Sequence, residues 1–245
     1  MPEEEFFKKF QEVTDVLSNY GWIISPYMIG GDFEKIYTLA LKIKANSSPT
    51  VKDKEDYQNN INEILTDVIF HPNFRAFFIV RSKEVKYISQ VSHHLERATL
   101  HYYKNDYFSA VLCLLPAIES SLLSYYGWNF QQGRKPSIDK LIKEIEKCRE
   151  NTFDNRSYQI YSKSISSYLK KWIYSDTSTA DTSFSYLNRH YVLHGMGSNN
   201  YYSLADVQRL LMLFDLLIEF FSIEQSIRYV FIPDNNKNLD ARREY

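Results

Sequence analysis

The stretch "YFSAVLCLLPAIESSLLSYYG", residues 107–127, is the most apolar segment of the chain, and it decides the fold class. Its apolar residues recur at helical spacing instead of alternating along the chain, which predicts a helix. Gly127 follows the last of them, and glycine is the residue best suited to the left-handed conformation that commonly ends a helix. We therefore expect a core helix over residues 107–126 that ends at Gly127.

Helical periodicity extends through nearly all of the remaining sequence. Only seven glycines and seven prolines interrupt 245 residues, which favours long helices over short strands joined by turns. Ser203 is followed three residues later by Asp206, a spacing that resembles a capping box at a helix start. The one candidate for a strand is "RAFFIV", residues 75–80. The sequence thus predicts an all-α fold, with one or two helices over residues 74–105 and further helices near residues 3–20, 32–45, 54–70, 136–151, 157–174, 183–194 and 203–229.

Composition and charge exclude several classes of protein. The net charge is −1, whereas a protein that coats nucleic acid over its whole surface is strongly basic. Cys113 and Cys148 are the only cysteines, too few for a disulfide framework or a cysteine zinc site. The N-terminus "MPEEEFFKKF" is acidic and does not resemble a signal peptide. We expect a cytoplasmic protein without a membrane-spanning segment.

The segment "LNRHYVLHGMG", residues 187–197, concentrates side chains that can carry chemistry. It places Asn188, Arg189, His190 and His194 among apolar residues on one short helix. One interpretation is a metal site, since His190 and His194 are four residues apart and share a helix face. Nothing in the spacing selects the further ligands, although His93, His94 and Glu119 are candidates. A second interpretation is structural, with Arg189 paired to a carboxylate.

The third interpretation of this segment is metal-free cleavage of RNA. Histidine titrates near neutral pH and suits proton transfer, while the planar fork of arginine suits a phosphate. Five residues separate Arg189 from His194, which places them about 140° apart around one helix axis. A second copy of the helix across a twofold axis would close this gap, so this interpretation favours a homodimer.

A family resemblance supports the third interpretation. The motif "NRHYVLHG", residues 188–195, resembles the signature of the HEPN superfamily (higher eukaryotes and prokaryotes nucleotide-binding). In that signature an arginine is followed by a polar residue and, four to six residues after the arginine, by a histidine. The segment "ATLHYYKNDYFSAVLCLLPAIESSL", residues 98–122, is similar to the early helical hairpin of the family, whose second helix carries a glutamate, here Glu119. The resemblance covers roughly residues 88–228.

The resemblance implies a metal-independent endoribonuclease that acts as a dimer, of the kind found in phage defence and toxin–antitoxin systems. His194 would then be the acid and base, Arg189 the phosphate clamp, and Asn188 and His190 their helpers. Glu119 would orient Arg189, with an ordinary surface carboxylate as the alternative. No cofactor or metal is expected, and the implied partners are RNA, a second copy and an antitoxin or other defence protein. Some HEPN proteins only bind, so a non-catalytic scaffold stays the alternative function.

Three further expectations concern organisation and substrate contact. The chain divides into an accessory helical region over residues 1–87, a HEPN-type domain over 88–230 and a polar tail over 231–245. Tyr201 and Tyr202 follow the motif and are candidates for stacking on an RNA base, or else they pack on their own scaffold. The hairpin at residues 95–126 also resembles one tetratricopeptide unit, but such units need neighbouring repeats and no second copy is found.

Overall fold

A computed structural model describes residues 3–25, 27–28, 30–129, 131, 133–147, 155–176, 187–189, 192 and 202–227. This part of the chain is helical and contains no strand, which confirms the all-α prediction. The α-helices are α1 (Glu3–Leu17), α2 (Gly30–Ala45), α3 (Val51–Ile69), α4 (Pro72–Ser82), α5 (Ser92–Tyr103), α6 (Tyr107–Tyr126), α7 (Ile138–Glu146), α8 (Asn155–Tyr168) and α10 (Leu204–Glu224). Short helical turns are η1 (Ser18–Tyr20), η2 (Ser89–Val91) and η4 (Leu169–Ile173), the last with π geometry.

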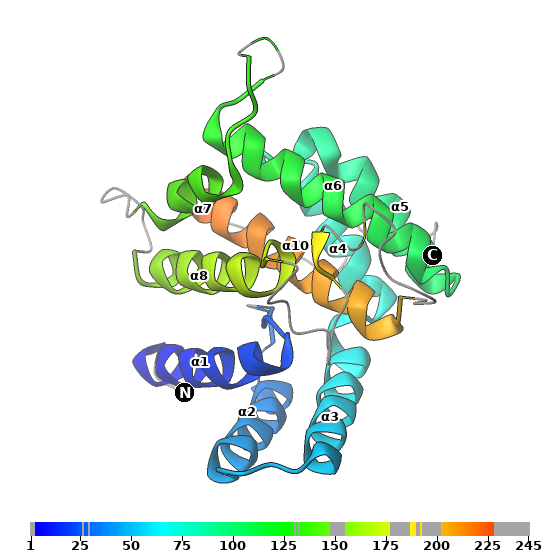
Figure 1. The fold of residues 1–245 in the computed structure, drawn as a ribbon, viewed down its shortest axis with the longest axis vertical. Helices are drawn as coiled ribbons and strands as arrows, with labels where there is room; N and C mark the ends of the chain where they lie inside the picture. The colour runs from blue at the N-terminus through cyan, green and yellow to red at the C-terminus, as the bar shows by residue number, and fades with distance from the viewer. Residues whose placement is uncertain are drawn as a thin grey trace.

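Helix α10 is the centre of the structure (Figure 1). It packs against α4, α5, α6 and α8, and its residues are buried almost without a break from Asp206 to Ile223. A helix that is apolar on all sides must be enclosed by others, and the sequence "LLMLFDLLIEFF", residues 210–221, meets that description. These four helices therefore enclose α10.

Helices α5 and α6 form a tight antiparallel hairpin. Asn105 lies in the turn with a positive φ of 58°, a conformation that asparagine tolerates better than most residues. Asp106 caps α6 by accepting a hydrogen bond from the Ser109 backbone N–H at 3.2 Å. Gly127 ends the helix with a φ of +83° in the left-handed region, so the predicted C-cap is confirmed.

The start of α10 has the predicted capping box. The Ser203 hydroxyl accepts from the Asp206 backbone N–H at 3.3 Å, and the Asp206 carboxylate accepts from the Ser203 backbone N–H at 2.9 Å. The strand considered for residues 75–80 is wrong, because these residues lie within α4. Pro72 occupies the first turn of α4. Its fixed φ suits a helix, and the backbone N–H that proline lacks would have no hydrogen-bond partner within the helix at this position.

The N-terminal helices pack onto the rest of the bundle. Helices α1, α2 and α3 follow one another as neighbours in the lower part of Figure 1, and α1 also contacts α8. Helix α4 packs on α10 through a buried ion pair, in which Arg75 Nη2 lies 2.6 Å from Asp215 Oδ2. One continuous core joins buried residues on both sides of the predicted boundary at residue 87.

Helix α6 is the one helix in the described ranges that is long and apolar enough to cross a membrane by length and composition. A buried core helix satisfies the same criteria, and α6 packs against both α5 and α10. Its buried side chains are those of Ala110, Val111, Leu114, Leu115, Ala117, Ile118, Glu119, Ser121, Leu122 and Tyr125.

Candidate functional site

The candidate site begins with a carboxylate on the core helix α6. Glu119 lies in the second half of this helix, and its side chain is only 12% exposed. A carboxylate that is withdrawn from water to this degree requires a positively charged or hydrogen-bonding partner. The chain supplies two cations for it, both distant in sequence.

The first cation is Arg189, whose position is fixed by buried neighbours. Leu187 and Val192 are buried on either side of it, and the Val192 N–H donates to the Asn188 carbonyl at 3.1 Å, a helical bond. The Asn188 amide donates to the Ser175 carbonyl at 2.6 Å and to its hydroxyl at 3.1 Å. These contacts attach the motif segment to the chain just after η4.

From this position Arg189 reaches α6. Its Nε donates to Glu119 Oε2 at 2.7 Å, while the arginine side chain stays 25% exposed. The bond uses Nε, so the two Nη groups of the guanidinium are not required for it. This bond restrains the guanidinium, and the remaining donors of an arginine fork are suited to binding a phosphate.

The second cation is Lys135, in the segment before α7. Its ammonium forms an ion pair with Glu119 Oε1, the oxygen that Arg189 does not use. One carboxylate therefore holds two cations, and the group of three carries a net positive charge. An anion such as a phosphate would find excess positive charge at this point of the surface.

The three charged residues are among those that line a small pocket of about 280 Å³. The remaining lining residues are mainly apolar and come from α7 and the segments around it. They are Pro136, Ile138, Leu141 and Tyr174. The pocket thus places an apolar wall beside two cations, a combination suited to a ligand with both a flat apolar part and a negative charge.

Burial changes the acid–base properties of two pocket residues. It lowers the pKa of the Lys135 ammonium below its ordinary value of 10.5, and the positive charge of Arg189 lowers it further. Burial raises the pKa of the Tyr174 phenol, with a smaller opposite effect from Arg189. Tyr174 is therefore neutral throughout the physiological range, and Lys135 loses its proton more readily than a free lysine.

The structure brings together Arg189 and Glu119, two of the residues selected from the sequence. Asn188, the residue before Arg189, is buried, and its side-chain amide donates to the Ser175 carbonyl. Asn188 is not among the residues that line the pocket. His190 and His194 lie outside the described residues. Lys135 and Tyr174 were missed, because neither belongs to a recognisable motif and only the folded chain brings them to Glu119.

Of the two tyrosines proposed to stack on RNA, the structure describes only Tyr202. Tyr201 lies outside the described residues. The Tyr202 ring stacks on Phe108 at the start of α6, with 5.9 Å between ring centroids and 21° between planes. Tyr202 is half-buried and Phe108 is 54% exposed. The ring of this pair that is more accessible to solvent is therefore that of Phe108. Eleven residues of α6 separate Phe108 from Glu119, roughly 16 Å along the helix.

His190 and His194, the two histidines of the alternative metal site, lie outside the described residues, so the structure places only the further candidate ligands. No group of three or more histidine, cysteine, aspartate or glutamate side chains is close enough there to hold an ion. His93 and His94 are neighbours on α5, with 4.2 Å between ring centroids, and burial lowers the pKa of His94. Glu119, the other candidate ligand, is paired with Arg189 and Lys135.

Comparison of the chain with protein-family models, curated proteins and solved structures gave no match.

Proposed function

We propose that the protein is a dimeric, metal-independent endoribonuclease of HEPN type. The observation that carries this proposal is the hydrogen bond from Arg189 to Glu119, 2.7 Å long, between the late motif and the early hairpin. The sequence resemblance expected this glutamate to orient this arginine. Lys135 adds a second cation at the same carboxylate, as a site for a charged phosphodiester requires.

The proposed reaction cleaves RNA without an added reactant. The 2'-hydroxyl oxygen attacks the neighbouring phosphorus, the bond to the 5'-oxygen breaks, and a 2',3'-cyclic phosphate and a 5'-hydroxyl result. A base must accept the 2'-hydroxyl proton and an acid must protonate the leaving oxygen, and we assign these proton transfers to His194. Arg189 and Lys135 stabilise the negative charge that builds on the phosphate oxygens.

The exposed face of α6 supports the dimer. Phe108, Leu112 and Tyr126 are exposed large apolar side chains, and Pro116 is exposed between them. On a helix of 3.6 residues per turn these positions lie within an arc of about 80°, and Glu119 lies inside the same arc. We assign this α6 stripe (Phe108, Leu112, Pro116 and Tyr126) to contact with a second copy, which would bring two Glu119–Arg189 pairs close together.

The alternative function is a non-catalytic scaffold in a toxin–antitoxin or defence complex. The same α6 stripe favours it, since exposed apolar side chains also suit a different protein partner. In that case Glu119, Arg189 and Lys135 form a structural ion-pair network without a substrate.

Cleavage of mixed RNA in excess EDTA distinguishes the two functions. The parent protein should cleave and leave 2',3'-cyclic phosphate ends, whereas Arg189→Ala and His194→Ala should each lose about 10²- to 10⁴-fold in rate. Arg97→Ala, which removes an exposed arginine from α5, is the matched control and should cleave like the parent. Purifying all four proteins in parallel excludes a contaminating nuclease. A folded parent that leaves RNA intact would overturn the ribonuclease proposal and favour the scaffold function.

A further inference from the structure

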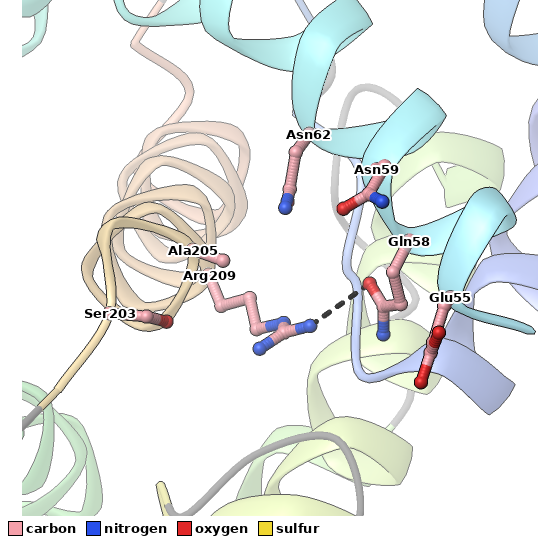
Figure 2. Close-up of a pocket in the computed structure, with 7 residues that line it drawn as sticks. All are labelled: Glu55, Gln58, Asn59, Asn62, Ser203, Ala205 and Arg209. Carbon is pink, nitrogen blue, oxygen red and sulfur yellow. Dashed lines mark hydrogen bonds between the residues drawn. The ribbon is translucent and has the colours of Figure 1, made fainter. Parts of the chain in front are cut away.

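A second pocket, of about 410 Å³, lies between α3 and the first turns of α10 (Figure 2). Small-ligand sites commonly have volumes of about 300–1,000 Å³. The residues that line this one are mainly polar and come from two helices that are far apart in sequence. They are Glu55, Gln58, Asn59, Asn62, Ser203, Ala205 and Arg209.

Arg209 forms a rigid side of this pocket. Its side chain is 3% exposed, and its guanidinium lies 4.6 Å from the centroid of the Trp22 ring. Nη1 donates to Asp206 at 3.1 Å, and Nη2 donates to the Gln58 side-chain oxygen, also at 3.1 Å. A long side chain held by this many contacts loses little further entropy when a ligand binds.

The opposite side of the pocket is a row of polar groups on α3. Glu55, Asn59 and Asn62 have the helical spacing i, i+4 and i+7, so they share one face over roughly 10 Å. Figure 2 shows Asn59 and Asn62 pointing from α3 toward the space that Arg209 enters from α10, with Glu55 farther along α3 beyond Gln58. Asn62 Oδ1 is buried and has no hydrogen-bond partner within the described residues. A buried acceptor of this kind favours a ligand that brings a donor.

The charges around the pocket favour a neutral ligand. The positive charge of Arg209 is paired with Asp206, and Glu55 adds a negative charge at the pocket wall. A phosphate would meet these carboxylates, and a metal ion would meet the guanidinium. Neither ion matches the site.

We propose that this pocket binds a nucleobase that carries an exocyclic amine. Each asparagine amide presents one donor side and one acceptor side in a plane, which matches the paired donor and acceptor on the edge of a base. The carboxylate of Glu55 can only accept, so it selects the amine of adenine, cytosine or guanine over the carbonyl of uracil. This inference is independent of the ribonuclease proposal, since it requires binding and no cleavage.

Free nucleosides test the inference directly. Adenosine, cytidine, guanosine and uridine are titrated into the full-length protein, and binding is followed by NMR of the nucleoside or by calorimetry. At least one amino-bearing nucleoside should bind about tenfold or more tightly than uridine, and more tightly than its own 5'-monophosphate. Ribose alone should not bind.

Two variants and one matched control assign the binding to this pocket. Asn59→Leu and Asn62→Leu should each weaken nucleoside binding about tenfold or more. Asn60→Leu changes the adjacent exposed asparagine, which does not line the pocket, and should bind like the parent. Thermal melting should show all three variants folded, since Asn62→Leu replaces a side chain whose oxygen has no partner within the described residues. The inference is overturned if no nucleoside binds at millimolar concentration, if the monophosphate or ribose binds equally well, or if the three variants behave alike.

Discussion

Arg189 and Glu119 lie 70 residues apart in sequence, and the arginine Nε donates to the carboxylate at 2.7 Å. This bond joins the segment that carries the Arg-His motif to the core helix of the α5–α6 hairpin. Because Glu119 also binds Lys135, the carboxylate fixes the relative positions of two cations. Substitutions that change the charge of Glu119 or Lys135 while keeping the shape of the side chain therefore separate the effect of charge from the effect of position.

Glu119→Gln tests whether this carboxylate positions Arg189. The amide removes a negative charge, so phosphate binding should stay the same or tighten, whereas the guanidinium loses its fixed orientation. We expect kcat for RNA cleavage to fall about 10²-fold with KM unchanged or lower, because small misplacements of a catalytic group cost rates of this order. Steady-state kinetics below the melting temperature provide the measurement. Unchanged kcat and KM in the folded variant would assign Glu119 a purely structural role.

Lys135 should set the alkaline limit of the activity. Its pKa is lowered by burial and by Arg189, so its charge is lost at a lower pH than the ordinary 10.5. Cleavage should therefore decline as pH rises through this lowered value, after subtraction of the alkaline hydrolysis of RNA. Lys135→Arg keeps its charge throughout and should move the decline to higher pH. If the two pH profiles coincide, Lys135 does not contribute a required charge.

The α6 stripe should control the oligomeric state. Leu112→Asp places a charge in the middle of the stripe, and burying an unpaired carboxylate in an interface is costly, so the variant should be monomeric. Val51→Asp is the matched control, because Val51 is also an apolar residue, is 75% exposed and lies on α3 away from the stripe. Light scattering coupled to size-exclusion chromatography gives the masses. A Leu112→Asp protein with the mass of the parent dimer would place the interface elsewhere.

Local sequence signals were sufficient for several helices and for some of their ends, but they left open whether residues 74–105 form one helix or two, and the structure has two, α4 and α5. The left-handed Gly127, the Ser203–Asp206 capping box and the helical periodicity depend on residues within a few positions of one another, so they could be predicted. The segment at residues 75–80 was ambiguous, because a short run of aromatic and branched residues suits a buried helix as well as a strand. Tertiary packing against α10 decides in favour of the helix.

Contacts between residues far apart in sequence could be predicted only where the family resemblance indicated them. Glu119 was selected from its place in the hairpin, and the structure brings it to Arg189. Lys135 and Tyr174 carry no motif, and periodicity identifies which face of a helix is buried without identifying what covers it. For the same reason nothing in the sequence indicated that Arg75 would meet Asp215 140 residues later, inside the core.

Asp215 should make the stability of the protein depend on pH. This carboxylate is fully buried, and burial raises its pKa from the ordinary 3.8 to about 6 although Arg75 opposes the shift. The folded chain then holds the Asp215 proton more tightly than the unfolded chain does. The stabilising contribution is complete below pH 3.8 and is lost as the pH rises through 6. The difference of 6 − 3.8 corresponds to about 3 kcal/mol.

Asp215→Asn isolates this contribution, because the amide stays neutral at every pH. Urea unfolding of parent and variant between pH 3 and 8 should show the parent losing about 3 kcal/mol relative to the variant as the pH rises. Asp56→Asn, an exposed carboxylate on α3, is the control and should follow the parent. If the parent instead gains stability over the variant with rising pH, the ion pair with Arg75 outweighs burial. The pKa of Asp215 would then lie below 3.8, and the Arg75–Asp215 ion pair would make a net favourable contribution to the stability of the folded protein at neutral pH.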